Sequence, residues 1–152
     1  GERVLASTTT SEGVVLAGTR DAFYLFADDA ARVRVPWEQV EAADWDRDSE
    51  VFSLSEVGTW GEQRREHVAT LTEPTRLLEL VRERVTASVV LQRHVPLDGR
   101  RGMRVIARRA PRGNRPIEWV YEYDEGVDPA DPAVVAAARE ALGSARQDLG
   151  EV

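Results

Sequence analysis

The hydrophobic and polar positions divide the chain into a strand-rich first half and a mixed second half. Short apolar runs, separated by turn residues such as Gly13 and Gly18, recur at roughly 8–12-residue spacing and predict six or seven strands. Arg32-Val33-Arg34-Val35 alternates between polar and apolar residues, which is typical of a strand with one buried face. The expected strands cover residues 4–8, 14–17, 22–26, 32–35, 40–45, 51–55 and 67–71.

Two segments show helical periodicity instead. Pro74 fits the first helical position, where its missing N–H costs nothing, and the apolar stripe Leu77, Leu78, Val81, Val85 follows it. The second helix starts at Asp131, a typical N-cap residue, and Gly150 ends it. Its apolar stripe comprises Val134, Val135, Ala138, Leu142, Ala145 and Leu149.

Between the helices, the pattern predicts a three-stranded meander. Its strands are expected from Val89 to Val95, from Arg104 to Ala110 and from Ile117 to Tyr123, with a hairpin turn at Asp98-Gly99. A chain of 152 residues fits one domain. We therefore expect a single α+β domain over residues 1–152, with a β-rich half at 1–95 and the rest of the meander plus a helix packed on it at 96–152.

The first half resembles the pleckstrin-homology-like (PH-like) fold of bacterial proteins. The resemblance rests on the strand count, on the segment RVPWEQVEAADWD that ends at Asp46, and on the helix TRLLELVRERV at Thr75–Val85. It implies an antiparallel β-barrel half with a capping helix, and the whole chain looks like a family of uncharacterised actinobacterial proteins. Pleckstrin-homology domains that bind lipids use basic residues in their first hairpin loop. The corresponding loop here, Thr8–Gly13, has none, so we expect no membrane binding.

Composition narrows the possible functions. The chain has no cysteine, which excludes disulfides, thiol nucleophiles and Cys-ligated metals. A net charge of −7 disfavours general binding to nucleic acid or anionic membranes. No apolar run approaches the ~18 residues of a membrane span, and no signal-peptide pattern opens the chain. We therefore expect a cytoplasmic protein.

No recognisable motif for catalysis, metal binding or cofactor binding occurs in the sequence. His67 and His94 fall in expected strands without the spacing of a metal site, and no nucleophile-elbow motif supports a hydrolase. The acidic clusters Asp28-Asp29 and Asp44–Glu50 have the composition of turns. We therefore predict no catalytic residue, no metal and no cofactor. An enzyme with an unrecognised histidine–carboxylate site is the second alternative.

The basic charge is concentrated in residues 93–115, which carry eight arginines and one acid. Arginines beside an aromatic strand suit single-stranded nucleic acid or a phosphate ligand, so such binding through residues 100–115 is an alternative function. Against it, cross-strand acids at Glu118, Glu122 and Asp124 would neutralise much of the charge. The arginines expected to stay free are Arg100, Arg101, Arg112 and Arg115.

We therefore expect a non-catalytic protein-interaction or scaffold module with an unidentified protein partner, and homodimerisation is a further expectation. Trp37 joins the four free arginines in the candidate interaction surface, because tryptophan and arginine often anchor interfaces. Trp45 and Trp60 are similar candidates, although for each of the three tryptophans a place in the core is the favoured interpretation.

Overall fold

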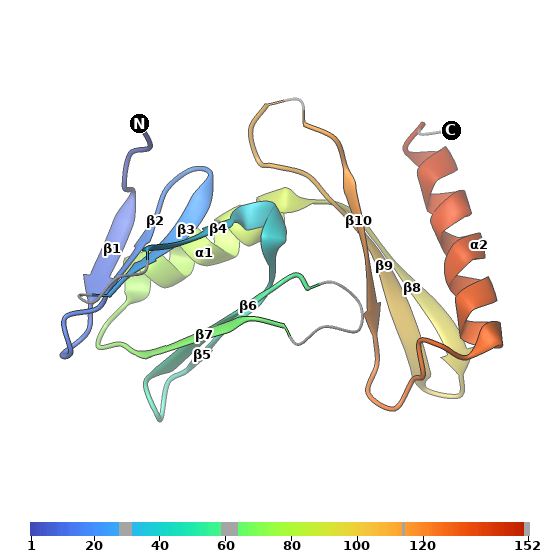
Figure 1. Ribbon diagram of the computed structural model, residues 1–152, viewed down its shortest axis with the longest axis horizontal. Coiled ribbons are helices and arrows are strands. Elements are labelled where there is room, and N and C mark those ends of the chain that lie inside the picture. Colours follow the sequence, from blue (N-terminus) through green and yellow to red (C-terminus); the bar gives the residue numbers. More distant parts are fainter. Residues whose placement is uncertain (28–31, 59–63, 114, 151–152) are drawn as a thin grey trace. The chain divides into compact units, whose positions relative to one another are not determined.

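The computed structural model describes residues 1–27, 32–58, 64–113 and 115–150. In this part of the chain, ten strands form three antiparallel sheets, and two α-helices and one 3-10 helix accompany them (Figure 1). The α+β class is confirmed. The chain forms two compact units. Unit 1 comprises Gly1–Ser88 and Ala110–Arg115, and unit 2 comprises Val89–Arg109 and Pro116–Val152.

Unit 1 begins with a four-stranded antiparallel sheet in simple meander order. Its strands are β1 (Ala6–Thr9), β2 (Val15–Gly18), β3 (Ala22–Phe26) and β4 (Arg32–Pro36). Pro36 ends β4, which lies at the sheet edge, where a missing N–H is tolerated. The alternation of Arg32-Val33-Arg34-Val35 is observed in the burial, because Val35 is buried and both arginines are exposed.

A second, three-stranded sheet follows the 3-10 helix η1 (Trp37–Gln39). It contains β5 (Val40–Asp46), β6 (Val51–Glu56) and β7 (Glu66–Thr70), in the order β5-β6-β7. The turn between β5 and β6 is held by the Asp46 carboxylate, which accepts hydrogen bonds from the backbone N–H groups of Asp48 (2.9 Å) and Ser49 (3.2 Å). This is the solvated acidic turn expected from the sequence.

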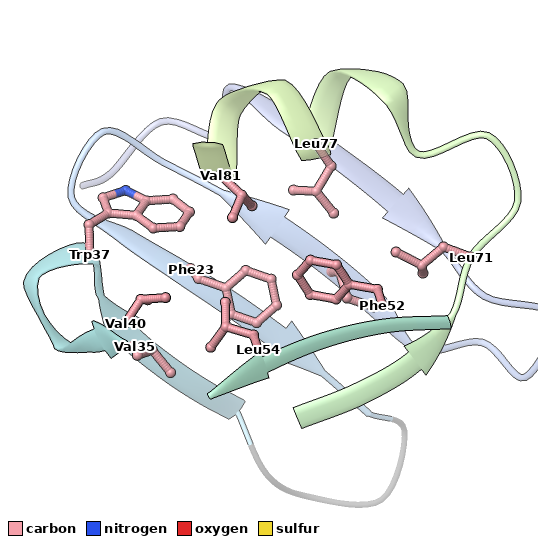
Figure 2. Close-up of a cluster of buried hydrophobic side chains, with 10 residues drawn as sticks. Phe23, Val35, Trp37, Val40, Phe52, Leu54, Leu71, Leu77 and Val81 are labelled. Atoms are coloured by element: carbon pink, nitrogen blue, oxygen red, sulfur yellow. The ribbon is translucent and has the colours of Figure 1, made fainter. Parts of the chain in front are cut away.

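Helix α1 (Thr75–Ser88) supplies one wall of the unit 1 core. Leu77 and Val81 point from α1 toward Phe23, Trp37 and other apolar side chains of the two sheets (Figure 2). Among the described residues, the cluster of buried side chains comprises Leu16, Phe23, Val35, Trp37, Val40, Phe52, Leu54, Leu71, Leu77 and Val81.

The expected barrel half takes the form of two separate sheets, and the described strands form no closed barrel. Most strand boundaries agree with the sequence pattern within one residue, and β3 agrees at both ends. The acidic pair Asp28-Asp29 lies outside the described residues.

Unit 2 is the predicted meander with its helix. It contains β8 (Val89–Asp98), β9 (Arg101–Arg108), β10 (Glu118–Tyr123) and α2 (Pro132–Asp148), with β9 in the centre of the sheet. Strand β8 belongs wholly to this unit, so the boundary between the compact units lies at Ser88/Val89. That the two units together form one domain stays a prediction.

One face of the unit 2 sheet packs under α2. Met103 and Val105 of β9 are fully buried with Ala138 and Ala145 of α2. The helix begins where the sequence predicts, because the Asp131 carboxylate accepts a hydrogen bond of 2.9 Å from the backbone N–H of Ala133. Neither helix in the described ranges is long and apolar enough to cross a membrane.

Candidate functional site

A groove lies between α1 and β5 within unit 1. Its volume is about 400 Å³, and both apolar and polar atoms line it. The lining residues are Ala43, Asp44 and Trp45 of β5, Phe52 of β6, and Leu78, Val81, Arg82, Val85 and Thr86 of α1. More of the lining surface is polar than apolar, and Asp44 and Arg82 bring opposite charges to it.

The alternation of β5 builds one wall of the groove. Ala43 pairs with Leu54, and Trp45 pairs with Phe52, so both side chains point to the core side of the sheet. Phe52 and Leu54 are buried, whereas Ala43 and Trp45 are only partly buried because they lie at the margin of the core. The indole of Trp45 is therefore anchored on the core and still borders open space.

The packing of α1 explains why the groove is open on this side. On the opposite side, Gly18 of β2 lets Leu80 come so close that a Cβ atom at Gly18 would lie 2.6 Å from Leu80 Cδ2. On the β5 side, Leu78 and Val85 are only partly buried and line the groove instead of filling it. Helix α1 thus lies close to β2 at Gly18, whereas Leu78 and Val85 leave space between the helix and β5.

Strand β5 also has an unpaired edge. It is the end strand of its sheet and, among the described strands, it pairs with β6 alone. Its outer N–H and C=O groups are therefore available to an additional strand, as is general for edge strands. An open edge next to a groove offers main-chain hydrogen bonds and space for side chains at the same place.

Acidic side chains follow this edge on the face away from the core. Asp44 and Asp46 are exposed, and neither forms an ion pair with a cation of the described residues. The backbone N–H groups of the β5–β6 turn lower the pKa of Asp46, so its carboxylate stays ionised at neutral pH. On the helix side, Arg82 supplies the single positive charge of the groove lining.

The three tryptophans proposed from the sequence as interaction residues lie in different environments. Trp37 is completely buried, and its Nε1–H donates a 2.9 Å hydrogen bond to the carbonyl oxygen of Thr19. It belongs to the core, so its place in an exposed interaction surface was wrong. Trp45 lines the groove, and Trp60 lies outside the described residues.

The arginine cluster is largely engaged within the protein. Arg104 forms an ion pair with Glu122 on the neighbouring strand, as the cross-strand argument predicted, and Arg108 is buried. Arg112 makes a bidentate contact with Asp21 inside unit 1, at 2.9 and 2.5 Å. These contacts remove three cations from the surface proposed for nucleic acid.

All four arginines expected to be free are exposed, but Arg112 is paired with Asp21. Arg100, Arg101 and Arg115 form no ion pair with any residue that the structure describes. Arg100 and Arg101 belong to unit 2, and Arg115 belongs to unit 1. Nucleic-acid or phosphate binding through this segment remains a hypothesis that rests on these three residues.

The aromatic strand does not offer its rings for base stacking. Trp119, Tyr121 and Tyr123 pack against the unit 2 core, on the face that α2 covers. Burial raises the pKa of Tyr121 and Tyr123, and the Tyr121 hydroxyl donates to the carbonyl oxygen of Ala138 at 3.4 Å. The interpretation of this stripe as a core face is confirmed.

The histidines show no arrangement for nucleophilic catalysis in the described residues. His67 Nε2 lies 2.7 Å from Glu56 Oε2, and both side chains are partly buried. Strand alternation places His67 on the core side of the sheet, whereas Ser53 and Ser55 of β6 point to the opposite face. His94 is exposed on β8, and its ring lies close to Gly102. The described residues also contain no cluster of three or more potential metal ligands.

A carboxylate network near the start of the chain could not be seen in the sequence. Glu2 accepts hydrogen bonds from Thr19 (2.8 Å), Tyr24 and Arg34 (3.2 Å), and these contacts lower its pKa, with Tyr24 as the largest cause. The network fastens the N-terminal segment to the four-stranded sheet. We therefore assign it a structural role.

Sequence reasoning also missed the groove as a site. The signal available was the alternation in the strand expected at residues 40–45, which places Trp45 on one face and Asp44 on the other.

The chain matches no protein-family model, and neither the curated proteins nor the solved structures contain a significant match to it.

Proposed function

We propose that this protein is a non-catalytic, cytoplasmic interaction module that binds a partner protein in the groove between β5 and α1. One observation carries the proposal: an unpaired strand edge borders a groove of about 400 Å³ that is lined by Trp45, Leu78 and Val85 together with charged residues. Binding by strand addition needs both features, because the edge supplies main-chain hydrogen bonds and the groove accepts alternate side chains.

We further propose that unit 1 has a PH-like fold. The support is the sequence of elements, a four-stranded meander, a three-stranded meander and then a helix, which is the order the resemblance implies. The separation of the strands into two sheets is compatible with a partly open barrel. Homodimerisation and the scaffold role stay predictions.

The test compares peptide selection by the wild-type protein and by a groove-blocked variant. Thr86 is exposed on α1 and lines the groove, so Thr86→Trp fills the groove without changing a buried residue. Ala87→Trp is the matched control, because Ala87 is the next residue of the same helix, is exposed and does not line the groove. A random-peptide library is displayed and selected on all three proteins.

We expect peptides enriched on the wild type to bind the Ala87→Trp variant equally and to lose at least tenfold in affinity for Thr86→Trp. Circular dichroism and thermal unfolding verify that both variants are folded. Enriched peptides that bind all three proteins equally would place the interaction elsewhere and contradict the proposal, as would the absence of any enrichment.

A further inference from the structure

We infer that the occupant of the groove is an extended, basic segment of a partner protein, which adds to β5 as a fourth strand of the β5-β6-β7 sheet. The inference rests on the proposed function and specifies the chemistry of its ligand. Its partner has apolar side chains at alternate positions and arginine or lysine at the positions between them.

Strand alternation explains the apolar positions. On a strand paired with β5, every second side chain points to the same side as Ala43 and Trp45, into the groove. There it meets the ring of Trp45 and the aliphatic side chains of Leu78 and Val85. Arg82 borders the same space from α1 and Asp44 borders it from β5, so a basic side chain pointing inward would lose hydration and meet a like charge on the helix side.

Charge complementarity explains the basic positions. The intervening side chains of the added strand point outward, on the face that carries Asp44 and Asp46. Both carboxylates are exposed and form no ion pair in the part of the chain that the structure describes. Opposite charges directly across a strand pair stabilise the pairing, so the edge selects arginine or lysine at these positions.

The same charges argue against a second copy of this chain as the occupant. Antiparallel pairing of two β5 strands would bring Asp44 and Asp46 of one copy close to the same acids of the other. Like charges across strands destabilise the pairing, and charged side chains on edge strands are a common device against self-association. The acids thus discourage self-pairing and favour a basic partner strand.

The test uses defined seven-residue peptides, the length of β5. The probe alternates valine and arginine and carries a fluorescent label. One comparison peptide has the same composition with valines and arginines in separate blocks, and another alternates valine and glutamate. A third repeats the probe with N-methyl groups on the backbone nitrogens along one edge, which removes the donors a new strand needs.

We expect the alternating valine–arginine peptide to bind in fluorescence anisotropy and to shift the backbone amide signals of residues 40–46 and 75–88 in NMR spectra. The other three peptides bind at least fivefold more weakly. Asp44→Asn lowers the affinity for the probe about two- to fivefold, the range of one cross-strand charge pair. Asp44→Arg shifts the preference toward the valine–glutamate peptide, and Asp98→Asn, an exposed acid in unit 2, changes nothing.

The outcomes separate this inference from the proposed function. If the library peptides depend on the open groove and the valine–arginine probe does not bind, the inference of a basic added strand is wrong, but the proposed binding in the groove is retained. If neither the library peptides nor the probe binds, the proposed function and the inference are both wrong. Equal binding by the block or N-methylated peptide, or amide shifts outside β5 and α1, overturns strand addition. Concentration-dependent amide shifts of β5 without peptide would identify a second copy as the occupant and overturn the inference as well.

Discussion

Helices α1 and α2 cover their sheets with side chains of different size. Helix α1 contacts its core through Leu77 and Val81, whereas α2 buries Ala138 and Ala145 against Met103 and Val105. Small side chains let a helix pack closely on a sheet, and larger ones increase the spacing. Helix α2 thus meets the buried residues of β9 through alanines, while α1, close to β2 at Gly18, borders a groove beside β5.

Because the chain has no catalytic motif, the groups that packing leaves unused indicate where it can bind a partner. The aromatic residues of unit 2 are used in packing under α2, and its charged strand residues partly neutralise one another. In unit 1, a tryptophan and an unpaired edge are left at the margin of the core. We therefore expect substitutions in unit 2 to affect mainly stability, and substitutions around the groove of unit 1 to affect mainly binding.

The largest effect is expected at the centre of the unit 1 core. Trp37→Ala removes a fully buried indole and leaves the carbonyl oxygen of Thr19 without its hydrogen bond. Aromatic-to-alanine changes in cores cost about 3–5 kcal/mol, so we expect a loss of this size in the free energy of unfolding, measured by chemical denaturation. Trp45→Ala is the control at the groove margin and should cost clearly less. Equal losses would mean that Trp45 is as deeply packed as Trp37.

The close packing of α2 can be tested by overfilling it. Ala145→Leu adds a branched side chain where Ala145 is completely buried, and overpacking of this kind costs about 1–3 kcal/mol. Hydrogen exchange should show the loss of protection in β8, β9 and α2. Gly143→Ala, on the exposed side of the same helix with no atom within 4 Å of the new Cβ, should instead stabilise by about 0.5–1 kcal/mol. A stable Ala145→Leu protein would show spare space under α2.

A smaller effect is expected at the start of α2. Asp131→Ala removes the side-chain acceptor of the Ala133 N–H, and loss of an N-cap costs about 1 kcal/mol. The matched control is Asp128→Ala, because Asp128 makes the same kind of contact, 2.9 Å to the N–H of Ala130, outside the helix. Thermal unfolding should separate the two variants. Equal changes would mean that the contact acts as a local turn and not as a helix cap.

The elements could be predicted from the sequence because local signals set them. The alternation at Arg32–Val35, the proline before α1 and the Asp131 cap each act within a few residues. The groove could not be predicted, because it depends on how closely α1 approaches β2 and β5, which are distant in sequence. Trp37 was misassigned for the same reason: in a short 3-10 segment, no periodicity shows which side chain faces the core.

Long-range ion pairs could not be predicted from the sequence either. One of them, Arg112–Asp21, joins residues 91 positions apart and gives the smallest expected effect. The hydrogen bonds from Arg112 lower the pKa of Asp21 below its ordinary value of 3.8. A carboxyl group with a lowered pKa in the folded state contributes stability above its unfolded pKa, and the contribution is lost as the pH falls through the folded pKa. Stability should therefore fall more steeply below about pH 4 in the wild type than in Asp21→Asn.

Both side chains of this pair are partly exposed, so solvent screens the interaction and the difference will be small. Urea unfolding at pH 3 and pH 6 measures it, with Asp98→Asn as the control for removal of one exposed acid. The measurement also tests the division into two units. Arg112 lies in the short segment Ala110–Arg115, which belongs to unit 1 although it connects β9 and β10 of unit 2 in the sequence. If Asp21→Asn and the wild type lose stability in parallel, the ion pair does not hold residues 110–115 against the rest of unit 1. In that case only backbone contacts would join this segment to unit 1.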